Sequence, residues 1–484
     1  MAQQPGLFEA LSPRRTVGFA CNQAFMFYVL YMGFNRSFEI GGLSFERAEL
    51  FFMLAFLVVG FFSFRRLGAG FHRVVLAKPA LYVCAIVASA TSLASALFPE
   101  YSVAWVVPEG LLIGAPASFL LLAWGLTFGR ERTSVTVSEV FLASLIGAAV
   151  CLLFSVAGSS SVFSAAFALL PLASVFNIDV PAWKGRASGP LSDLAGGAGE
   201  KGKLSAKIMA GTSLFGCAAG LMETYGTDPG SATMPFHTAS FVVFCAFLIG
   251  SLSLLLSHGF GRGAALNKSY RLSILVVMMG ILIVGWPAAD LSPTPGKAYV
   301  LAGYLGLEAV LISLFLVLAE ILEVDSSLAF SQGFGALFAG ELIGLLLGNL
   351  NDLVSASLMH GVPMIATTLD SASHFAVVLS GALVLIAYVF LFTERDFDNL
   401  SEIVTKEDAF ERTCQIMAAR FELSRRESEI LAFALRGRTS ERIAQELTVS
   451  KSTVDTHLRR IYAKMEIHSR QELLDVAESI EEGL

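Results

Sequence analysis

The chain has 484 residues, of which 55% are hydrophobic and only 15% are charged, and its formal net charge is −7. About a quarter of the residues in an ordinary soluble domain are charged. Together with a mean hydropathy of +0.67, this composition excludes a wholly soluble protein and indicates an integral membrane protein.

Twelve apolar stretches are long enough to cross a bilayer, which takes about 20 residues of helix. The N-terminus is not typical of a signal peptide, because the apolar stretch after Arg14 and Arg15 is too long and no small-residue cleavage site follows it. The sequence therefore predicts a polytopic helical bundle. Its spans are expected near 16–34, 48–64, 74–98, 103–128, 135–157, 160–178, 204–225, 236–257, 271–291, 298–321, 327–350 and 373–393.

The basic residues between the spans predict how the bundle is oriented. With the N-terminus in the cytoplasm, sixteen Lys and Arg residues lie in inner connections before the tail, and only Arg36, Arg47 and Lys297 lie in outer ones. Positive charge is enriched on the cytoplasmic side of membrane proteins. Because the number of spans is even, we expect both termini in the cytoplasm.

The connection 181–203 is the longest inside the bundle, and its Gly, Ser, Ala and Lys content is typical of a flexible cytoplasmic loop. It divides the bundle into halves of six helices, 1–180 and 204–393. This layout resembles the major facilitator superfamily of transporters. That family usually has a Gly…Asp-Arg-x-Gly-Arg pattern between its second and third helices. The segment from Phe64 to Arg73 has glycines and bases here but no acid, which argues against transport.

Polar side chains within the spans are candidates for a ligand site, because an acid at the bilayer centre costs about 2.5–3.5 kcal/mol on insertion scales and usually faces the bundle interior. Glu341 and Glu308 lie in mid-span, and Glu109 follows Pro108, where we expect a break in the helix. Acids without matched bases in the spans would suit a phenol, an amine or a proton-coupled carrier. The candidate ligand-binding residues are Glu341, Glu308, Glu109, Asn22, Gln23, Trp105, Trp124, Trp286 and Tyr304.

Two features of the spans have a simpler interpretation. Each of these aromatic residues alone is expected more often to pack against lipid or a neighbouring helix than to line a pocket. The glycines at 340, 344 and 348 fall on one face of a helix. Small residues at this spacing let two helices approach closely, so this stripe predicts packing.

The composition changes at Thr393, beyond which the chain is charged and has no run long enough to span a membrane. A first helix of a soluble domain is expected to begin with a capping box of Ser424 and Glu427. The apolar stripe that follows ends at Gly437. Three further helices are predicted at 440–447, 451–465 and 470–479. A turn motif precedes the helix 451–465, which Ser450 caps.

The helix 451–465 has the character of a recognition helix, because its face opposite the core is polar and basic. Arg459 is long enough to reach a guanine, Thr456 suits a thymine methyl group and Asp455 suits a cytosine amine. Other bases nearby suit phosphates, and residues 436–470 hold eight basic and four acidic residues. The candidate DNA-binding residues are Arg438, Lys451, Ser452, Thr453, Asp455, Thr456, His457, Arg459, Arg460 and Lys464.

Residues 423–474 resemble the DNA-binding domain of the LuxR family along their whole length. After the turn that family usually reads Thr-Val-Lys-x-His, and here the sequence from Thr453 to His457 has Asp455 in place of the lysine. The whole chain is similar to multi-pass membrane LuxR-type regulators, some of which respond to small aromatic molecules such as catechols. The resemblance implies double-stranded DNA as a partner, a homodimer through the fourth helix, RNA polymerase as a partner of an activator, and a bacterial inner membrane.

We therefore expect an all-α chain: a transmembrane sensor bundle over 1–393, a linker helix over 394–420 and a LuxR-type domain over 421–484. The expected function is regulation of transcription in response to a small molecule bound by the bundle. Two alternatives are a major-facilitator-like transporter with a regulatory DNA-binding tail, and an inert anchor for that tail. The sequence shows no nucleophile–base set, phosphate loop, metal-ligand cluster or CxxC pair. We expect no enzyme activity, no cofactor and no metal.

Overall fold

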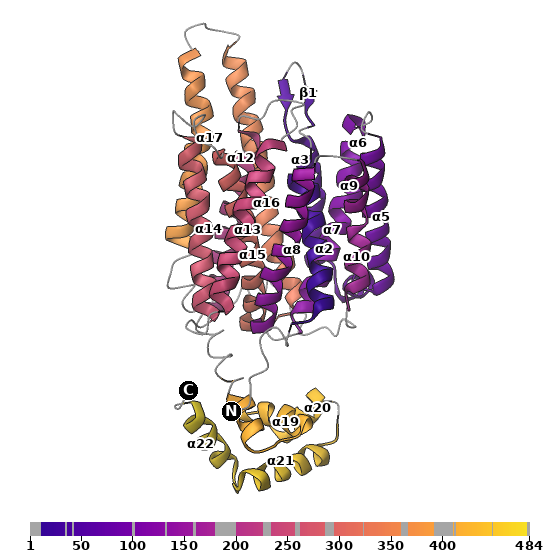
Figure 1. The fold of residues 1–484 in the computed structure, drawn as a ribbon, viewed down its shortest axis with the longest axis vertical. Coiled ribbons are helices and arrows are strands. Elements are labelled where there is room, and N and C mark those ends of the chain that lie inside the picture. Colours follow the sequence, from indigo (N-terminus) through magenta and orange to yellow (C-terminus); the bar gives the residue numbers. More distant parts are fainter. Residues whose placement is uncertain are drawn as a thin grey trace. The chain divides into compact units, whose positions relative to one another are not determined.

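The computed structural model describes most of the chain in two compact units, Met1–Leu400 and Ser401–Leu484. Figure 1 draws both as ribbons, and each is described by itself. Most of the predicted loop 181–203 lies outside the described residues. The described residues are 11–33, 36–40, 43–98, 102–130, 133–157, 161–179, 200–225, 234–256, 262–285, 295–322, 324–359, 366–391, 410, 413–447 and 449–481.

The first half of the bundle begins with a capped helix. Ser12 accepts a hydrogen bond from the backbone of Arg15, and Pro13 occupies the first turn, where its missing N–H costs nothing. The helices of this half are α2 (Pro13–Tyr31), α3 (Ala48–Arg66), α4 (Ala69–Val75), α5 (Lys78–Leu97), α6 (Ser102–Glu109), the π-helical turn η2 (Gly110–Gly114), α7 (Ala115–Phe128), α8 (Thr133–Ala157), α9 (Ser161–Ala168) and α10 (Leu170–Asn177).

In the second half of the bundle, the helix α15 packs against α14, α13 and α16, and it also packs against α8 of the first half. All of the most apolar window of α15 is buried. The helices of this half are α12 (Glu200–Thr224), α13 (Met234–Leu256), α14 (Arg262–Val284), α15 (Gly296–Leu322), α16 (Ser326–Met359), α17 (Ala366–Ile386) and the π-helical turn η5 (Ala387–Leu391).

Each predicted span overlaps a helix or a pair of short helices in the described part of the chain. Eight of these helical segments are long and apolar enough to cross a membrane. The other predicted spans overlap two shorter apolar helices, 164–177 and 375–389, or fall on α2 and α12, which carry polar residues along their length. The fold is a polytopic helical bundle, as predicted.

A short hairpin lies in a segment that the sequence predicts to be a loop between spans. Strand β1 (Phe38–Ile40) pairs antiparallel with β2 (Leu43–Phe45), so that Phe38 lies opposite Phe45 and Ile40 opposite Leu43. A Gly-Gly dipeptide separates the two strands in the sequence, and such dipeptides favour tight hairpin turns. The hairpin leads directly into Arg47 and α3 (Figure 1).

The glycine stripe packs two helices together, as predicted. Side chains at positions 340 and 344 of α16 would overlap the backbone oxygens of Ser213 and Cys217 on α12, and one at 348 would overlap the Thr224 hydroxyl. The glycines at 216 and 220 of α12 face α16 in the same way. The glycines on both helices therefore permit the close approach of α12 and α16, which positions Glu341 beside α12.

The predicted break at Pro108 is wrong. Pro108 lies inside α6, and the chain continues through η2 into α7. A proline removes one hydrogen bond of the helix ladder, and a wider π-turn absorbs the resulting misfit without ending the helix. The turn is held tightly, because a side chain at Gly110 would overlap the backbone of Phe52 on α3.

The C-terminal unit forms around its own hydrophobic core, to which Met417, Ile430, Ile443, Val454 and Leu473 contribute. Residues 413–420 are helical, and four further helices follow. The second and third of these have the predicted bounds, and the fourth extends two residues beyond the prediction. They are α19 (Arg425–Leu435), α20 (Ser440–Leu447), α21 (Lys451–Met465) and α22 (Arg470–Glu481).

The local signals that delimit these helices are confirmed. Ser424 and Glu427 form a reciprocal capping box, with the Glu427 carboxylate 2.8 Å from the Ser424 backbone nitrogen. Gly437 has φ +77°, a left-handed conformation that a glycine adopts without a steric penalty. The Arg438 N–H then donates to the Phe433 carbonyl at 3.1 Å. These contacts end α19 and turn the chain into α20.

Candidate functional site

The third helix of the C-terminal unit, α21, presents a polar face opposite the domain core. Val454, Ile461 and Met465 are buried in that core. Ser450 caps the helix by accepting a hydrogen bond from the Thr453 backbone at 3.2 Å. The predicted DNA-binding residues Ser452, Thr456, Arg459 and Arg460 are exposed, and Asp455 is half-buried. The helical spacing of the apolar residues therefore places these side chains where a DNA groove could receive them.

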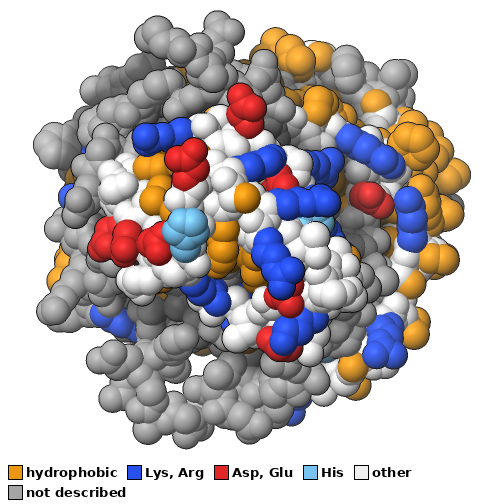
Figure 2. All heavy atoms as spheres, turned by 90° about the horizontal axis from the view of Figure 1, so that it is seen from below, with side chains coloured by type: hydrophobic (Ala, Val, Ile, Leu, Met, Phe, Trp, Pro, Cys, Tyr) orange, Lys and Arg blue, Asp and Glu red, His pale blue; other side chains and the backbone are white. Residues whose placement is uncertain are grey.

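Basic side chains stand on the surface of this unit, with acidic side chains between them (Figure 2). Arg459 and Arg460 form no ion pair or hydrogen bond with any described residue. Lys451 pairs with Glu441 of α20, and this contact raises the pKa of Lys451 and lowers that of Glu441. The two arginines are therefore more available for an anionic partner than Lys451 is.

Arg438 is exposed just before α20, and its backbone carbonyl accepts a hydrogen bond from Arg470 at 2.9 Å. The side chain of Arg470 also holds the carbonyl of Ala434 at 2.7 Å. Arg470 therefore fixes the turn between α19 and α20, and leaves the guanidinium of Arg438 at the surface beside α20.

Two predicted DNA-binding residues have other positions. Lys464 donates to the Glu427 carboxylate at 2.8 Å and to the Glu422 carbonyl at 2.8 Å, so its charge is bound within the domain. The hydrogen bond from Lys464, helped by the Ser424 N–H, lowers the pKa of Glu427 to about 2. His457 is half-buried, with its Nδ1 out of contact with solvent. The Lys464 side chain is nonetheless 39% exposed, and the part that both residues play at DNA stays a prediction.

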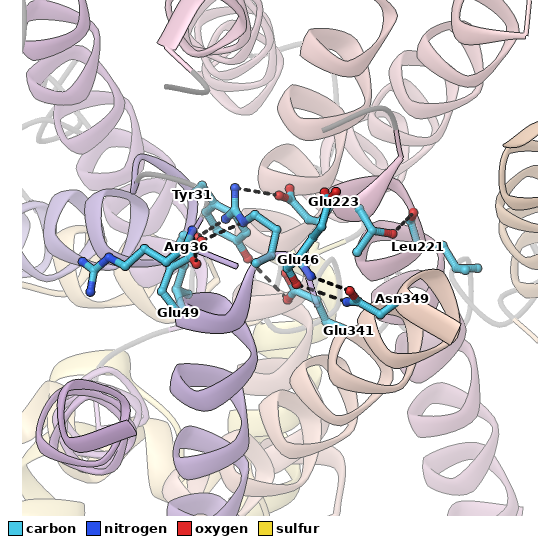
Figure 3. Close-up of polar contacts among 11 residues, drawn as sticks. Tyr31, Arg36, Glu46, Glu49, Leu221, Glu223, Glu341 and Asn349 are labelled. Atoms are coloured by element: carbon cyan, nitrogen blue, oxygen red, sulfur yellow. Dashed lines mark hydrogen bonds and ion pairs between the residues drawn. The ribbon is translucent and has the colours of Figure 1, made fainter. Parts of the chain in front are cut away.

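Arg47 is the centre of a buried polar cluster in the bundle. Its side chain is 1% exposed and its φ of 56° lies in the left-handed region, which few non-glycine residues adopt. The guanidinium lies 3.0 Å from the Glu49 carboxylate and 3.3 Å from that of Glu223, and it donates to the Leu30 carbonyl at 3.0 Å. Glu49 and Glu223 are both labelled in Figure 3, where dashed lines mark the polar contacts.

This cluster connects the two halves of the bundle. Arg47 follows the hairpin of the first half, whereas Glu223 lies near the end of α12. Beside them, the Asn349 amide of α16 accepts from the Glu46 backbone nitrogen at 2.6 Å and donates to the Glu46 carbonyl at 3.1 Å (Figure 3). The segment between β2 and α3 is therefore bound to α12 and α16 by an ion pair and two hydrogen bonds.

Glu341 on α16 contacts side chains of two other helices, α15 and α2. Its carboxylate accepts a hydrogen bond from the Tyr304 hydroxyl of α15 at 2.8 Å and a longer one from Tyr31 of α2 at 3.4 Å. The rings of the two tyrosines meet edge to face, with centroids 6.1 Å apart. Glu308, one turn beyond Tyr304, is 3% exposed. The predicted residues Tyr304, Glu308 and Glu341 thus belong to one cluster.

Two narrow pockets adjoin the cluster and share Tyr304, Ala219 and Val300. The first pocket has a cavity volume of about 20 Å³, and Arg47, Glu223 and Lys297 line it. The second has a cavity volume of about 10 Å³, and its walls include Phe215, Val277, Ile281 and Leu307. Volumes of this size hold about one water molecule each.

The other predicted ligand residues lie elsewhere or at the margin. Glu109 pairs with Arg36, whose backbone N–H donates to Glu49 at 3.0 Å, so it joins the cluster only through that arginine. Glu139, which is not among the predicted ligand residues, likewise pairs with Arg15 at 2.9 Å. The expectation of acids without matched bases is therefore wrong for Glu109, because Arg36 from another segment folds onto it.

The predicted tryptophans and amides do not line the two pockets. Trp124 is fully buried, donates to the Ser174 hydroxyl at 2.9 Å and packs against Phe19 and Phe128, so its role is structural. Trp105 is 36% exposed on the bundle surface. Asn22 and Gln23 are buried between α2 and its neighbours, about two turns of helix or more from Tyr31. Trp286 lies outside the described residues.

Sequence reasoning missed Arg47, Glu49, Glu223 and Tyr31. Counting charges between spans treats every base there as solvated, and it therefore places Arg47 in an outer connection. The sequence Glu46-Arg47-Ala48-Glu49 at the head of a span did contain a signal, because a base between two acids so close to an apolar run is suited to burial as an ion pair.

Comparison with known proteins identifies the C-terminal segment. Residues 422–477 match the family described as bacterial regulatory proteins, luxR family. The response regulatory protein YgeK of Escherichia coli is 36% identical over 87 residues, which are 17% of this chain and 59% of that protein. The response regulator protein TodT of Pseudomonas putida is 40% identical over 62 residues, 13% of this chain and 27% of that protein. The chain therefore spans less than two thirds of the length of each of these relatives.

The bundle has low-scoring structural similarities to transporters. A crystal structure of the major facilitator superfamily transporter FucP in the outward conformation has a TM-score of 0.46 at 12% identity, covering 77% of this chain and 96% of that chain. The nucleoside transporter NupG has a TM-score of 0.42 at 14% identity, with the same coverage. The apolar helices make the chain a multi-pass membrane protein, and residues 422–477 are a DNA-binding domain of the LuxR family.

Proposed function

We propose that the protein is a membrane-embedded transcription regulator whose bundle binds a small molecule and thereby controls DNA binding by the LuxR-type domain. One observation carries the proposal: a single chain combines that DNA-binding domain with a bundle whose two halves meet at a buried polar cluster around Arg47 and Glu341. Ionisable groups inside a membrane protein usually mark a functional site. An inert anchor would need no such cluster.

The ligand acts only if it binds two states of the bundle with different affinities. The cluster suits this role, because its contacts cross between the halves and depend on their separation. We propose a small aromatic, catechol-like molecule as the ligand class. A phenol hydroxyl is a donor that suits the buried carboxylates, and the side chains beside Tyr304 include the apolar Phe215, Val277 and Ile281.

The remaining features of the proposal concern topology and assembly. We propose that the bundle lies in a bacterial inner membrane with both termini in the cytoplasm, which the distribution of bases supports. The chain is divided into a sensor bundle over 1–393, a linker helix over 394–420 and a DNA-binding domain over 421–484. The DNA-binding domain forms a homodimer through α22, and an activated complex contacts RNA polymerase.

The DNA-facing residues proposed on this basis are the exposed ones of α21 together with Arg438. Arg459 reads a base edge, while Arg460, Lys451 and Arg438 contact phosphates. Ser452, Thr453, Asp455 and Thr456 contribute the remaining polar contacts at the groove.

A transporter with a regulatory DNA-binding tail is the alternative. It is favoured by the pairing of carboxylates with tyrosines at the boundary of the halves. The missing acid in the connection between the second and third spans argues against it.

Transcript profiling distinguishes these functions. A strain lacking the gene is compared with strains that carry the intact gene or the Arg459→Ala variant, with and without a panel of small aromatic compounds. We expect one compound to change transcription of a set of genes only in the strain with the intact chain. If no compound changes transcription and the deletion strain takes up a solute differently, the result would contradict the sensor function and support the transporter function.

A further inference from the structure

Among the bases proposed to contact DNA phosphates, only Lys451 pairs with an acid in the described part of the chain. It begins α21, and its ammonium group contacts the carboxylate of Glu441 in the first turn of α20. The two residues are ten positions apart, so their contact joins the two helices. Asp455, one turn further along α21, adds a second negative charge near this ammonium group. Two acids of the domain therefore attract Lys451.

The acids of α20 pair with bases of α20 and α21, whereas the arginines later in α21 have no such partner. The second acid of α20, Glu446, pairs with Arg442 of the same helix at 3.1 Å. Arg459 and Arg460 form no ion pair with any described residue. The basic charge on this side of the domain is thus partly neutralised from within, and α20 supplies the neutralising acids.

The contact between Lys451 and Glu441 is open to exchange with another anion. The two side chains are 56% and 58% exposed, and an ion pair in such a place is weak because water screens it. A DNA phosphate therefore competes with the Glu441 carboxylate for the same ammonium group. A lysine that neutralises a phosphate releases a counterion, so each such contact makes log K fall with log salt more steeply, by about 0.9.

We propose that Glu441 limits sequence-independent binding to DNA, because its carboxylate competes with the phosphates for Lys451. The domain then gains less affinity from its positive charge alone, and a larger share of its affinity depends on the base contacts of α21. Glu441 thereby increases specificity without touching a base. This inference rests on the proposed function, which places the exposed residues of α21 against DNA.

The test measures binding of the full-length chain in detergent to a fluorescent DNA duplex of mixed sequence, by anisotropy at several salt concentrations. Glu441→Gln keeps the shape of the side chain but removes its charge. We expect this variant to bind about two- to fivefold more tightly at low salt, as the strength of an exposed ion pair implies. Its salt slope should be steeper by about 0.9. Glu466→Gln makes the same change of net charge at an exposed position after α21, and it should bind like the wild type.

A second variant, Lys451→Ala, shows whether Glu441 acts through Lys451. When Lys451→Ala is already present, adding Glu441→Gln should change neither the affinity nor the salt slope. An equal gain in that background would overturn the inference, because Glu441 would then repel DNA directly. Binding that Glu441→Gln alone leaves unchanged or weakens would overturn it as well. If Arg459→Ala still weakened binding, only the role of Glu441 would be rejected, whereas a wild type that does not bind the duplex would reject the DNA-facing surface too.

Discussion

Charged residues have opposite roles in the two units of this protein. In the C-terminal unit they stand at the surface of a core that local sequence defines, and exposed arginines such as Arg459 are left for a partner. In the bundle cluster they are buried, and several contacts join residues far apart in the chain: 310 positions separate Tyr31 from Glu341, and 303 separate Glu46 from Asn349. The first arrangement offers charge to a ligand, whereas the second uses charge to connect two halves.

This difference teaches where a change of state can arise. The capping box and apolar stripes of the C-terminal unit specify one compact domain. The bundle cluster depends on the distance between its halves, because the Arg47–Glu223 pair and the Tyr31–Glu341 hydrogen bond exist only while those halves are joined. In the proposed function, the bundle is therefore the element with two states, and the DNA-binding unit is the part that responds to it.

The largest expected effect comes from removing the base of the cluster. Arg47→Ala leaves Glu49 and Glu223 buried without their cation, and breaking a buried ion pair on one side costs about 3–5 kcal/mol. We expect a markedly lower unfolding midpoint for the solubilised protein. The triple variant Arg47→Met, Glu49→Gln, Glu223→Gln removes the charges together and should recover much of the loss. A triple variant as unstable as Arg47→Ala would show that the guanidinium acts through packing and not through charge.

The sequence predicted the C-terminal unit much better than the cluster, for a physical reason. Helix caps and apolar periodicity act within about ten residues, so Ser424, Gly437 and Ser450 could be assigned from their neighbours. The positions of the helices of the bundle also follow from local composition. The partner of a buried charge, in contrast, is decided by tertiary packing. Nothing near Arg47 indicates that Glu223 will lie beside it.

A second prediction tests the exposed side of the comparison. Arg459→Ala should abolish promoter activation while membrane insertion stays intact, because the loss of one base contact costs about 1–3 kcal/mol, or about 5- to 150-fold in DNA affinity. DNA binding is measured by fluorescence anisotropy at fixed salt. Arg425→Ala is the matched control, since its side chain is 96% exposed on α19 and lies outside the proposed face. Equal losses in both variants would indicate a general effect of positive charge.

A third prediction concerns the helix packing that holds Glu341 in place. Gly344→Ala adds a methyl group where α16 contacts the Cys217 carbonyl of α12, and such overpacking costs about 1–3 kcal/mol. Gly250→Ala adds the same group on α13, where no atom lies within 4 Å. We expect the unfolding midpoint to fall for the first variant and to stay the same or rise slightly for the second. Equal midpoints would contradict close packing of α12 on α16.

The smallest expected effect is a pH dependence confined to the C-terminal unit. The pKa of Glu427 is lowered to about 2 in the folded domain by the hydrogen bond from Lys464, whereas an unfolded glutamate titrates near 4.3. The folded state therefore gains stability above the unfolded pKa and loses it as the pH falls from about 5 towards 2. Because Lys464 is 39% exposed, solvent screening reduces the contribution to about 1–2 kcal/mol.

Denaturant unfolding of a fragment of residues 401–484, which contains its own core, measures this pH dependence by circular dichroism. Glu427→Gln keeps the shape of the side chain but cannot ionise, so its stability should change less between pH 5 and pH 3 than that of the wild type. Glu466→Gln, at an exposed position after α21, should retain the wild-type profile. If Glu427→Gln retained it as well, the internal ion pair with Lys464 would not stabilise the domain, and Lys464 would again be available to DNA phosphates.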